Sequence, residues 1–187
     1  MRLPRALAVL FCLASAAVPA EGRVFLTQAE ALSLAFPPGV VVLRKTAFLT
    51  EAQRREARSL SGVDRLPDAL VAFYVGTRYG REVATAYFDT HVVRTLAETV
   101  MILVDAAGSI ARIEVLSFGE PEEYLPRPHW YGQFSGRKLD DELSLKHGVR
   151  AVSGATLTAR ATTEAARRIL AMDQVLRRRA PRSVHEP

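Results

Sequence analysis

The sequence predicts an α+β fold in which a mainly antiparallel sheet packs against helices. Apolar segments of strand length follow one another in consecutive hairpins, which favours an antiparallel sheet over a doubly wound parallel one. The chain then ends in a long helical pattern, from Ala159 to about Arg179, that follows a Ser-Gly-Ala-Thr loop. No repeat, linker or break in composition divides residues 21–187, so we expect them to form one domain.

Two capping boxes predict the helices of the N-terminal half. Thr27-x-x-Glu30 predicts a short helix that ends at Pro37-Pro38, and Thr50-x-x-Gln53 predicts a second helix that ends near Ser61-Gly62. The β-branched run at residues 39–43 predicts a strand between them.

Two hairpins are predicted next. Their strands are residues 70–77, 82–89, 99–105 and 110–118. Apolar and polar residues alternate in the last strand, which suits a sheet with one covered face. Residues 119–149 contain prolines and aromatic residues with little periodicity, so we expect a long structured loop of the kind that often builds a site.

The last helix should bury one apolar stripe. Its members are Ala165, Ile169, Met172 and Leu176, with Glu164, Arg167 and Arg168 off the stripe. The four histidines show no metal-ligand spacing, so no metal site is expected. For His91 a surface turn is the simpler interpretation.

The N-terminus predicts export. Arg2 and Arg5 precede an apolar run at residues 6–18, and small residues before Glu21 suit cleavage of a signal peptide at residues 1–20. The run is shorter than the roughly 20 residues that span a bilayer, so a retained membrane anchor is the less favoured alternative. Cys12, the only cysteine, lies in that run. The mature chain would then have no thiolate, disulfide or iron–sulfur cluster. The full chain carries a formal charge of only +5, which argues against nucleic-acid binding.

The segment Val152-Ser153-Gly154-Ala155-Thr156-Leu157-Thr158-Ala159 is the most informative one. A Ser-Gly pair allows a tight turn, and two threonines present hydroxyl groups where the helix begins. The free N–H groups and positive dipole of a helix start suit a phosphate group. A simple N-cap preceded by a loop of small residues would give the same local pattern.

The wider segment VSGATLTARATTEAARRIL resembles the flavinylation motif of the FMN-binding domain of RnfG and NqrC, subunits of redox-driven ion pumps, and of related secreted flavoproteins. The resemblance implies that Thr156 carries FMN through a phosphoester bond. Upstream, Glu120-Pro121 and Tyr124 are similar to an acidic-Pro element of secreted relatives, and Trp130, Gln133-Phe134 and Gly136 to a W-x-x-Q-F-x-G element.

The cofactor-binding residues expected from this resemblance are Ser153, Gly154, Ala155, Thr156, Leu157, Thr158, Tyr124, Trp130 and Lys138. Tyr124 and Trp130 could contact the flavin ring or pin the loop to the core, whereas Phe134 favours the core. Thr158 is expected to cap the helix. Arg137 and Lys138 could place positive charge near the flavin, although plain surface exposure is the simpler role for both.

The resulting hypothesis is an exported electron carrier with FMN, loaded by a flavin transferase and exchanging electrons with redox partner proteins at or outside the membrane. We expect a carrier rather than a substrate-turning enzyme, and find no catalytic residue. One position departs from the motif, because Arg150 stands where the family usually has aspartate six residues before the acceptor threonine. This departure favours the alternative, an exported binding or scaffold domain of the same fold without flavin.

Overall fold

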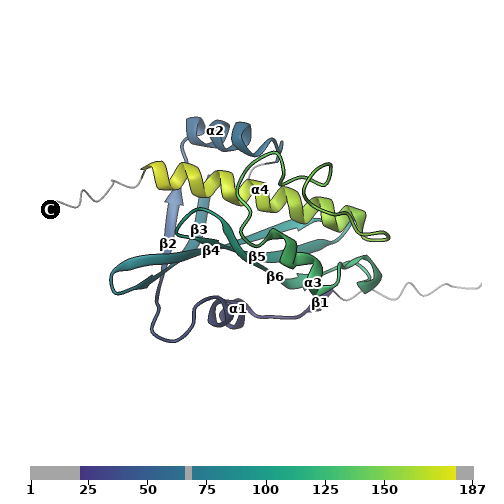
Figure 1. Cartoon of the computed structure of the whole chain (residues 1–187), viewed down its shortest axis with the longest axis horizontal. Helices are drawn as coiled ribbons and strands as arrows, with labels where there is room; N and C mark the ends of the chain where they lie inside the picture. Colours follow the sequence, from purple (N-terminus) through teal and green to yellow (C-terminus); the bar gives the residue numbers. More distant parts are fainter. Residues whose placement is uncertain (1–21, 66–68, 180–187) are drawn as a thin grey trace, which may run out of the picture.

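The computed structural model describes residues 22–65 and 69–179 of the 187-residue chain, which form one antiparallel sheet with helices on both faces (Figure 1). The sheet has the order β1-β6-β5-β4-β3-β2. Its strands are β1 (Arg23–Val24), β2 (Val41–Phe48), β3 (Leu70–Arg78), β4 (Arg81–Val92), β5 (Ala97–Asp105) and β6 (Ile110–Phe118). The predicted α+β class and the antiparallel arrangement are confirmed.

Both faces of the sheet are covered, as Figure 1 shows. The long helix α4 (Thr156–Arg179) crosses one face with α2 (Glu51–Ser61) packed on it, and α1 (Gln28–Ala35) covers the other face. Side chains of β5 therefore alternate between two cores: Val100, Ile102 and Val104 face α4, while Met101 and Leu103 face α1. Such double coverage explains why β5 is an almost continuous apolar run.

The two predicted capping boxes are present. The Thr27 and Thr50 side chains accept the N–H groups of Glu30 and Gln53, whose side chains in turn accept from the threonine N–H groups. The helices end as expected, α2 with Gly62 in the left-handed conformation at φ 65°.

Strand bounds differ from the predicted ones by one or more residues in every predicted strand but the last, and two of the differences matter most. The predicted strand at residues 39–43 begins at Val41 and continues to Phe48, because it pairs with β3 over its whole length. The strand predicted to end at Asp89 continues to Val92, because it pairs with β5 as far as Ala97. This second extension places His91 inside the sheet and corrects its interpretation as part of a surface turn.

Helix α4 begins at Thr156, three residues before the predicted start, so the Ser-Gly-Ala-Thr segment runs into the helix itself. The predicted apolar stripe packs against the sheet. Arg168, which the periodicity places off this stripe, is nevertheless only 5% exposed and pairs with Asp89 of β4. A buried carboxylate on the facing strand supplies the partner that makes its burial possible.

The long segment between β6 and α4 has only three short helical turns: η1 (Glu122–Tyr124), α3 (Pro128–Tyr131) and η2 (Gly132–Phe134). Its aromatic residues Trp130, Tyr131 and Phe134 pack into the core cluster that β5 and β6 share with α4. Within the segment, Trp130 meets the rings of Tyr131 and Phe134 edge to face at 5.0 and 5.2 Å. Phe134 is fully buried, which confirms its predicted place in the core.

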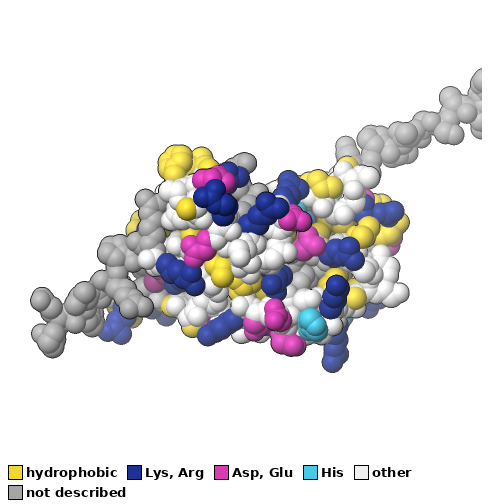
Figure 2. Space-filling model, turned by 90° about the horizontal axis from the view of Figure 1, so that it is seen from above, with side chains coloured by type: hydrophobic (Ala, Val, Ile, Leu, Met, Phe, Trp, Pro, Cys, Tyr) yellow, Lys and Arg dark blue, Asp and Glu magenta, His cyan; other side chains and the backbone are white. Residues whose placement is uncertain are grey.

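The surface above α2 and α4 carries interspersed charges of both signs (Figure 2). Some of them form ion pairs, such as Arg58 with Asp64 and Arg178 with Glu56. Among the described residues, no helix combines the length and the apolar character needed to cross a membrane. The predicted signal peptide at residues 1–20 lies outside the described residues.

Candidate functional site

The loop before α4 is a tight turn that glycine makes possible. The Ala155 N–H donates to the Val152 carbonyl at 3.1 Å, which closes a four-residue turn, and Gly154 in its third position has a φ of 84°. The Ala159 N–H donates to the Ala155 carbonyl and forms the first turn of α4. The N–H groups of Thr156, Leu157 and Thr158 precede that bond and have no carbonyl four residues earlier within the helix.

The two threonine hydroxyls at this helix start have different environments. Thr156 is exposed, and its hydroxyl donates at 3.1 Å to the Val152 carbonyl. Thr158 is fully buried, and its hydroxyl donates at 2.5 Å to the Tyr124 carbonyl. The predicted role of Thr158 as a helix cap is therefore wrong: it lies inside the first turn and ties α4 to η1. Only Thr156 of the two presents its hydroxyl to solvent.

The approach to this turn is fixed by two side chains of the W-x-x-Q-F-x-G element. The indole N–H of Trp130 donates to the Arg150 carbonyl at 2.7 Å, and the Gln133 side-chain oxygen accepts the Arg150 N–H at 2.8 Å. Gly136 ends the element with a φ of 78°. Because both contacts use the backbone of Arg150, they place the loop whatever side chain residue 150 carries, and the Arg150 side chain is exposed.

A small pocket of about 170 Å³ lies beside the Thr156 hydroxyl. Its lining residues are Arg94, Tyr124, Gly154, Ala155, Thr156, Leu157 and Thr158. This lining contains a cation and several helix-start N–H groups but no carboxylate, so it suits an anion. Its volume lies below the roughly 300–1,000 Å³ of pockets that enclose a whole small molecule. The pocket therefore fits one end of a cofactor, such as a phosphate group.

Arg94 was not identified from the sequence. It lies in the turn between β4 and β5, and its guanidinium carbon is 4.5 Å from the centre of the Tyr124 ring. The carboxylate of Glu120 holds this turn, because one oxygen accepts the N–H groups of Arg94, Thr95 and Leu96 at 3.2, 2.6 and 2.8 Å. These bonds, that of Thr95 first, lower the pKa of Glu120. The acidic-Pro element thus builds the wall opposite α4.

Residues 97–171 match the family model of the FMN-binding domain. The match indicates FMN as the cofactor and hence a flavin-binding protein. Searches of curated proteins and of solved structures found no match to the chain. The matched segment runs from the first residue of β5 into α4 and contains the Thr156 turn, the W-x-x-Q-F-x-G element and Glu120. Arg94 and His91 lie just before it.

The structure brings most of the expected cofactor residues together. Residues 154–158 and Tyr124 line the pocket, and the exposed Ser153 stands at the turn beside it. Trp130 and Lys138 do not line the pocket. Trp130 is buried under the loop that it holds. Lys138 is exposed and follows Arg137, whose carbonyl accepts the N–H of Ile110 at the start of β6. The pocket lies near the end of β6, roughly 25 Å along the strand.

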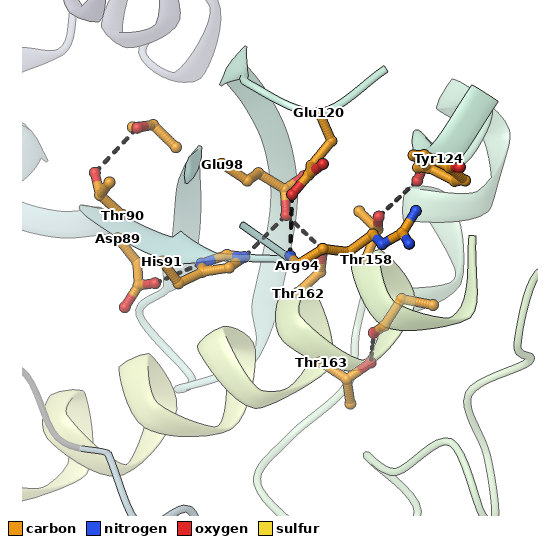
Figure 3. A network of polar contacts seen from close by, with 12 residues as sticks. Asp89, Thr90, His91, Arg94, Glu98, Glu120, Tyr124, Thr158, Thr162 and Thr163 are labelled. Atoms are coloured by element: carbon orange, nitrogen blue, oxygen red, sulfur yellow. Dashed lines mark hydrogen bonds and ion pairs between the residues drawn. The ribbon is translucent and has the colours of Figure 1, made fainter. Parts of the chain in front are cut away.

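A buried polar cluster joins β4 and β5 to α4, beginning at Thr162, about one turn of α4 after the pocket residue Thr158 (Figure 3). The two ring nitrogens of His91 lie 2.8 Å from an Asp89 oxygen and 2.9 Å from a Glu98 oxygen. Arg168 of α4 donates to the same Asp89 oxygen at 2.8 Å, and Thr162 donates to Glu98 at 3.1 Å. Asp89 and His91 stand two residues apart on one strand face, a pattern that could have indicated the cluster.

The cluster favours a doubly protonated imidazole. A ring with a carboxylate at each nitrogen must carry two protons to donate both hydrogen bonds. Burial alone would lower the pKa of His91, but the hydrogen bonds and charges of Asp89 and Glu98 outweigh it and raise the pKa. Burial likewise opposes ionisation of Asp89, yet the bonds from His91 and Arg168 lower its pKa. Two cations then face two carboxylates in the interior.

Proposed function

We propose that this protein is an exported flavoprotein that carries FMN on Thr156 through a phosphoester bond and relays electrons between redox proteins at or outside the membrane. The observation that carries the attachment site is the contrast between the threonines at the start of α4. Thr156 presents an exposed hydroxyl beside a pocket without carboxylates, whereas the hydroxyl of Thr158 is buried and bonded to Tyr124.

The described residues fit the phosphate end of FMN. The N–H groups of Thr156, Leu157 and Thr158 and the dipole of α4 would hold the phosphate oxygens. During attachment, the Thr156 oxygen would bond to the phosphorus of a flavin nucleotide bound to the transferase. If that nucleotide is a flavin dinucleotide, the bond from this phosphorus to the bridging oxygen would break, a nucleoside monophosphate would leave, and the hydroxyl proton would pass to a base of the transferase. FMN, when bound, supplies the redox chemistry, and the protein positions it.

The alternative is an exported scaffold domain without flavin, which Arg150 favours because the family motif usually has an acid there. The geometry nevertheless supports flavin binding, since Trp130 and Gln133 hold residue 150 through its backbone alone. The substitution leaves the turn, the exposed Thr156 hydroxyl and the pocket in place.

The experiment is to co-express the full chain with a flavin transferase, purify it and record its visible spectrum before and after denaturation. We expect the absorption of oxidised flavin, retained by the polypeptide after acid precipitation. Release of the flavin on denaturation would mean that the protein binds FMN without a covalent bond. A colourless protein that takes up no added FMN would favour the scaffold.

A further inference from the structure

We propose that Arg94 recognises the phosphate group of the flavin nucleotide and makes the site select FMN over riboflavin. This inference rests on the proposed function and assigns a residue that lies outside the segment matched by the FMN-binding domain. Arg94 projects from the β4–β5 turn toward Tyr124 and Thr158, across from the first turn of α4 (Figure 3).

No carboxylate of the described residues forms an ion pair with the Arg94 guanidinium. The carboxylate beside it, Glu120, instead accepts backbone N–H groups of the turn. The guanidinium carbon of Arg94 lies over the Tyr124 ring, 4.5 Å from its centre, which is a contact with a ring face and not with an anion. The guanidinium N–H groups are therefore available to an anionic ligand.

The turn that carries Arg94 is held in place before any ligand binds. Glu120 accepts three N–H groups in succession, and the Val93 N–H donates to the Leu96 carbonyl at 3.1 Å. Behind the turn, a Cβ at Gly119 would lie only 2.8 Å from the Leu96 Cβ, so the two backbones approach as closely as glycine allows. A rigid turn loses little freedom when Arg94 binds a ligand.

The wall of the pocket opposite Arg94 is also suited to an anion. The first residues of α4, with their free N–H groups, and Thr156 line a space of about 170 Å³ that Arg94 lines from the other side. A guanidinium binds two phosphate oxygens with parallel hydrogen bonds, whereas riboflavin has no phosphate to accept them. Arg94 would thus bind the same phosphate group that Thr156 would bond covalently.

The test compares FMN and riboflavin binding to the mature full chain produced without flavin transferase, by quenching of flavin fluorescence. We expect wild type to bind FMN about tenfold more tightly than riboflavin or better. Arg94→Gln should weaken FMN binding about tenfold and leave riboflavin binding unchanged. Arg94→Lys keeps the charge but loses the planar guanidinium fork, so its affinity for FMN should lie between those of the wild type and Arg94→Gln. Arg127→Gln removes an exposed cation of the same region that does not line the pocket, and should change neither affinity.

Equal affinity of wild type for FMN and riboflavin would overturn the inference, as would Arg94→Gln weakening both ligands alike. The second result would mean that Arg94 acts on the ring or on the fold. Arg94→Gln should fold normally, because Glu120 holds the turn through backbone N–H groups; unchanged thermal unfolding checks this. Covalent loading of Thr156 is measured separately by mass, so loading without FMN preference would reject this inference and leave the proposed function standing.

Discussion

Thr156 and Thr158 look equivalent in the sequence but have different roles in the structure. The hydroxyl of Thr156 is exposed, whereas that of Thr158 is buried and forms a structural hydrogen bond. Thr158 faces the sheet because α4 begins at Thr156, and residues 158 and 162 then share the inner face of the helix. Its hydroxyl satisfies the Tyr124 carbonyl. Thr156 faces outward and remains available for chemistry.

Removal of the Thr158 hydroxyl should therefore lower the free energy of unfolding by more than the loss of a helix cap at the surface would. We expect Thr158→Val to reduce the free energy of unfolding by about 1–3 kcal/mol, because the half-buried Tyr124 carbonyl loses its donor. Thr163→Val is the matched control. Thr163 is also buried in α4, but its hydroxyl donates to the Ala159 carbonyl one turn earlier. That carbonyl keeps its helical N–H donor, so the loss should be smaller. Urea denaturation measures both; equal losses would contradict a specific role for the Thr158–Tyr124 bond.

The role of a single residue could be predicted where neighbouring residues in the sequence determine it, but not where a residue distant in the sequence does. The capping threonines, the glycine turn before α4 and the burial of Phe134 follow from short patterns. His91, Arg168 and Arg94 do not, because their roles depend on Glu98, Asp89 and Tyr124, which only the folded sheet and helix bring near.

At the scale of elements, the β4–β5 hairpin is fixed at two places. The cluster of Asp89, His91, Glu98 and Arg168 ties its strands to α4, and Glu120 ties its turn to the segment after β6. The hairpin supplies one wall of the pocket and α4 supplies the other. The buried cluster thus holds the two walls together.

This cluster predicts a dependence of stability on pH. The pKa of His91 is raised in the folded protein above its ordinary 6.5, so its contribution is complete below pH 6.5 and is lost as the pH rises through the raised value. The pKa of Asp89 is lowered, so its contribution is present above its ordinary 3.8 and is lost as the pH falls through the lowered value. The free energy of unfolding, measured by urea denaturation at a series of pH values, should decrease as the pH rises above 6.5.

His91→Gln should remove the decline in stability above pH 6.5. It should also lower the free energy of unfolding at neutral pH by about 3–5 kcal/mol, because Asp89 and Glu98 lose the cation between them. His129→Gln, at an exposed histidine, should keep the wild-type pH profile. If His91→Gln does not fold, NMR of the wild-type ring gives the answer directly. Two protonated ring nitrogens at neutral pH agree with the account, whereas titration of His91 below pH 6.5 contradicts it.

Element types were predictable from periodicity, and their bounds less so. Strand β4 and helix α4 both extend beyond their predicted limits, β4 because β5 continues to pair with it and α4 because the turn at Gly154 feeds directly into a helical residue. Both extensions build the site, since they place His91 in the sheet and Thr156 in the helix.

In the molecule as a whole, the pocket lies where three segments distant in the sequence meet: the turn at residues 93–96, the segment at 120–124 and the start of α4. A phosphate site there leaves the rest of a bound cofactor near the surface. An open position suits the proposed exchange of electrons with partner proteins.

The proposal that the protein works outside the cytoplasm has its own test. We expect the mature chain to begin at Glu21 and to be recovered from the periplasm or the medium, because residues 1–20 have the pattern of a signal peptide. N-terminal sequencing of the native protein measures this. Met1 on a membrane-bound product would indicate a retained anchor instead.

Intact mass under denaturing conditions tests most directly whether Thr156 carries the flavin. The wild-type chain, exported from cells that contain a flavin transferase, should gain the mass of one FMN joined through a phosphoester. Thr156→Ala should gain none, while Ser153→Ala and Thr158→Val, which change the neighbouring hydroxyls, should keep the added mass. Added mass that persists in Thr156→Ala, or its absence from the wild type, would contradict the account.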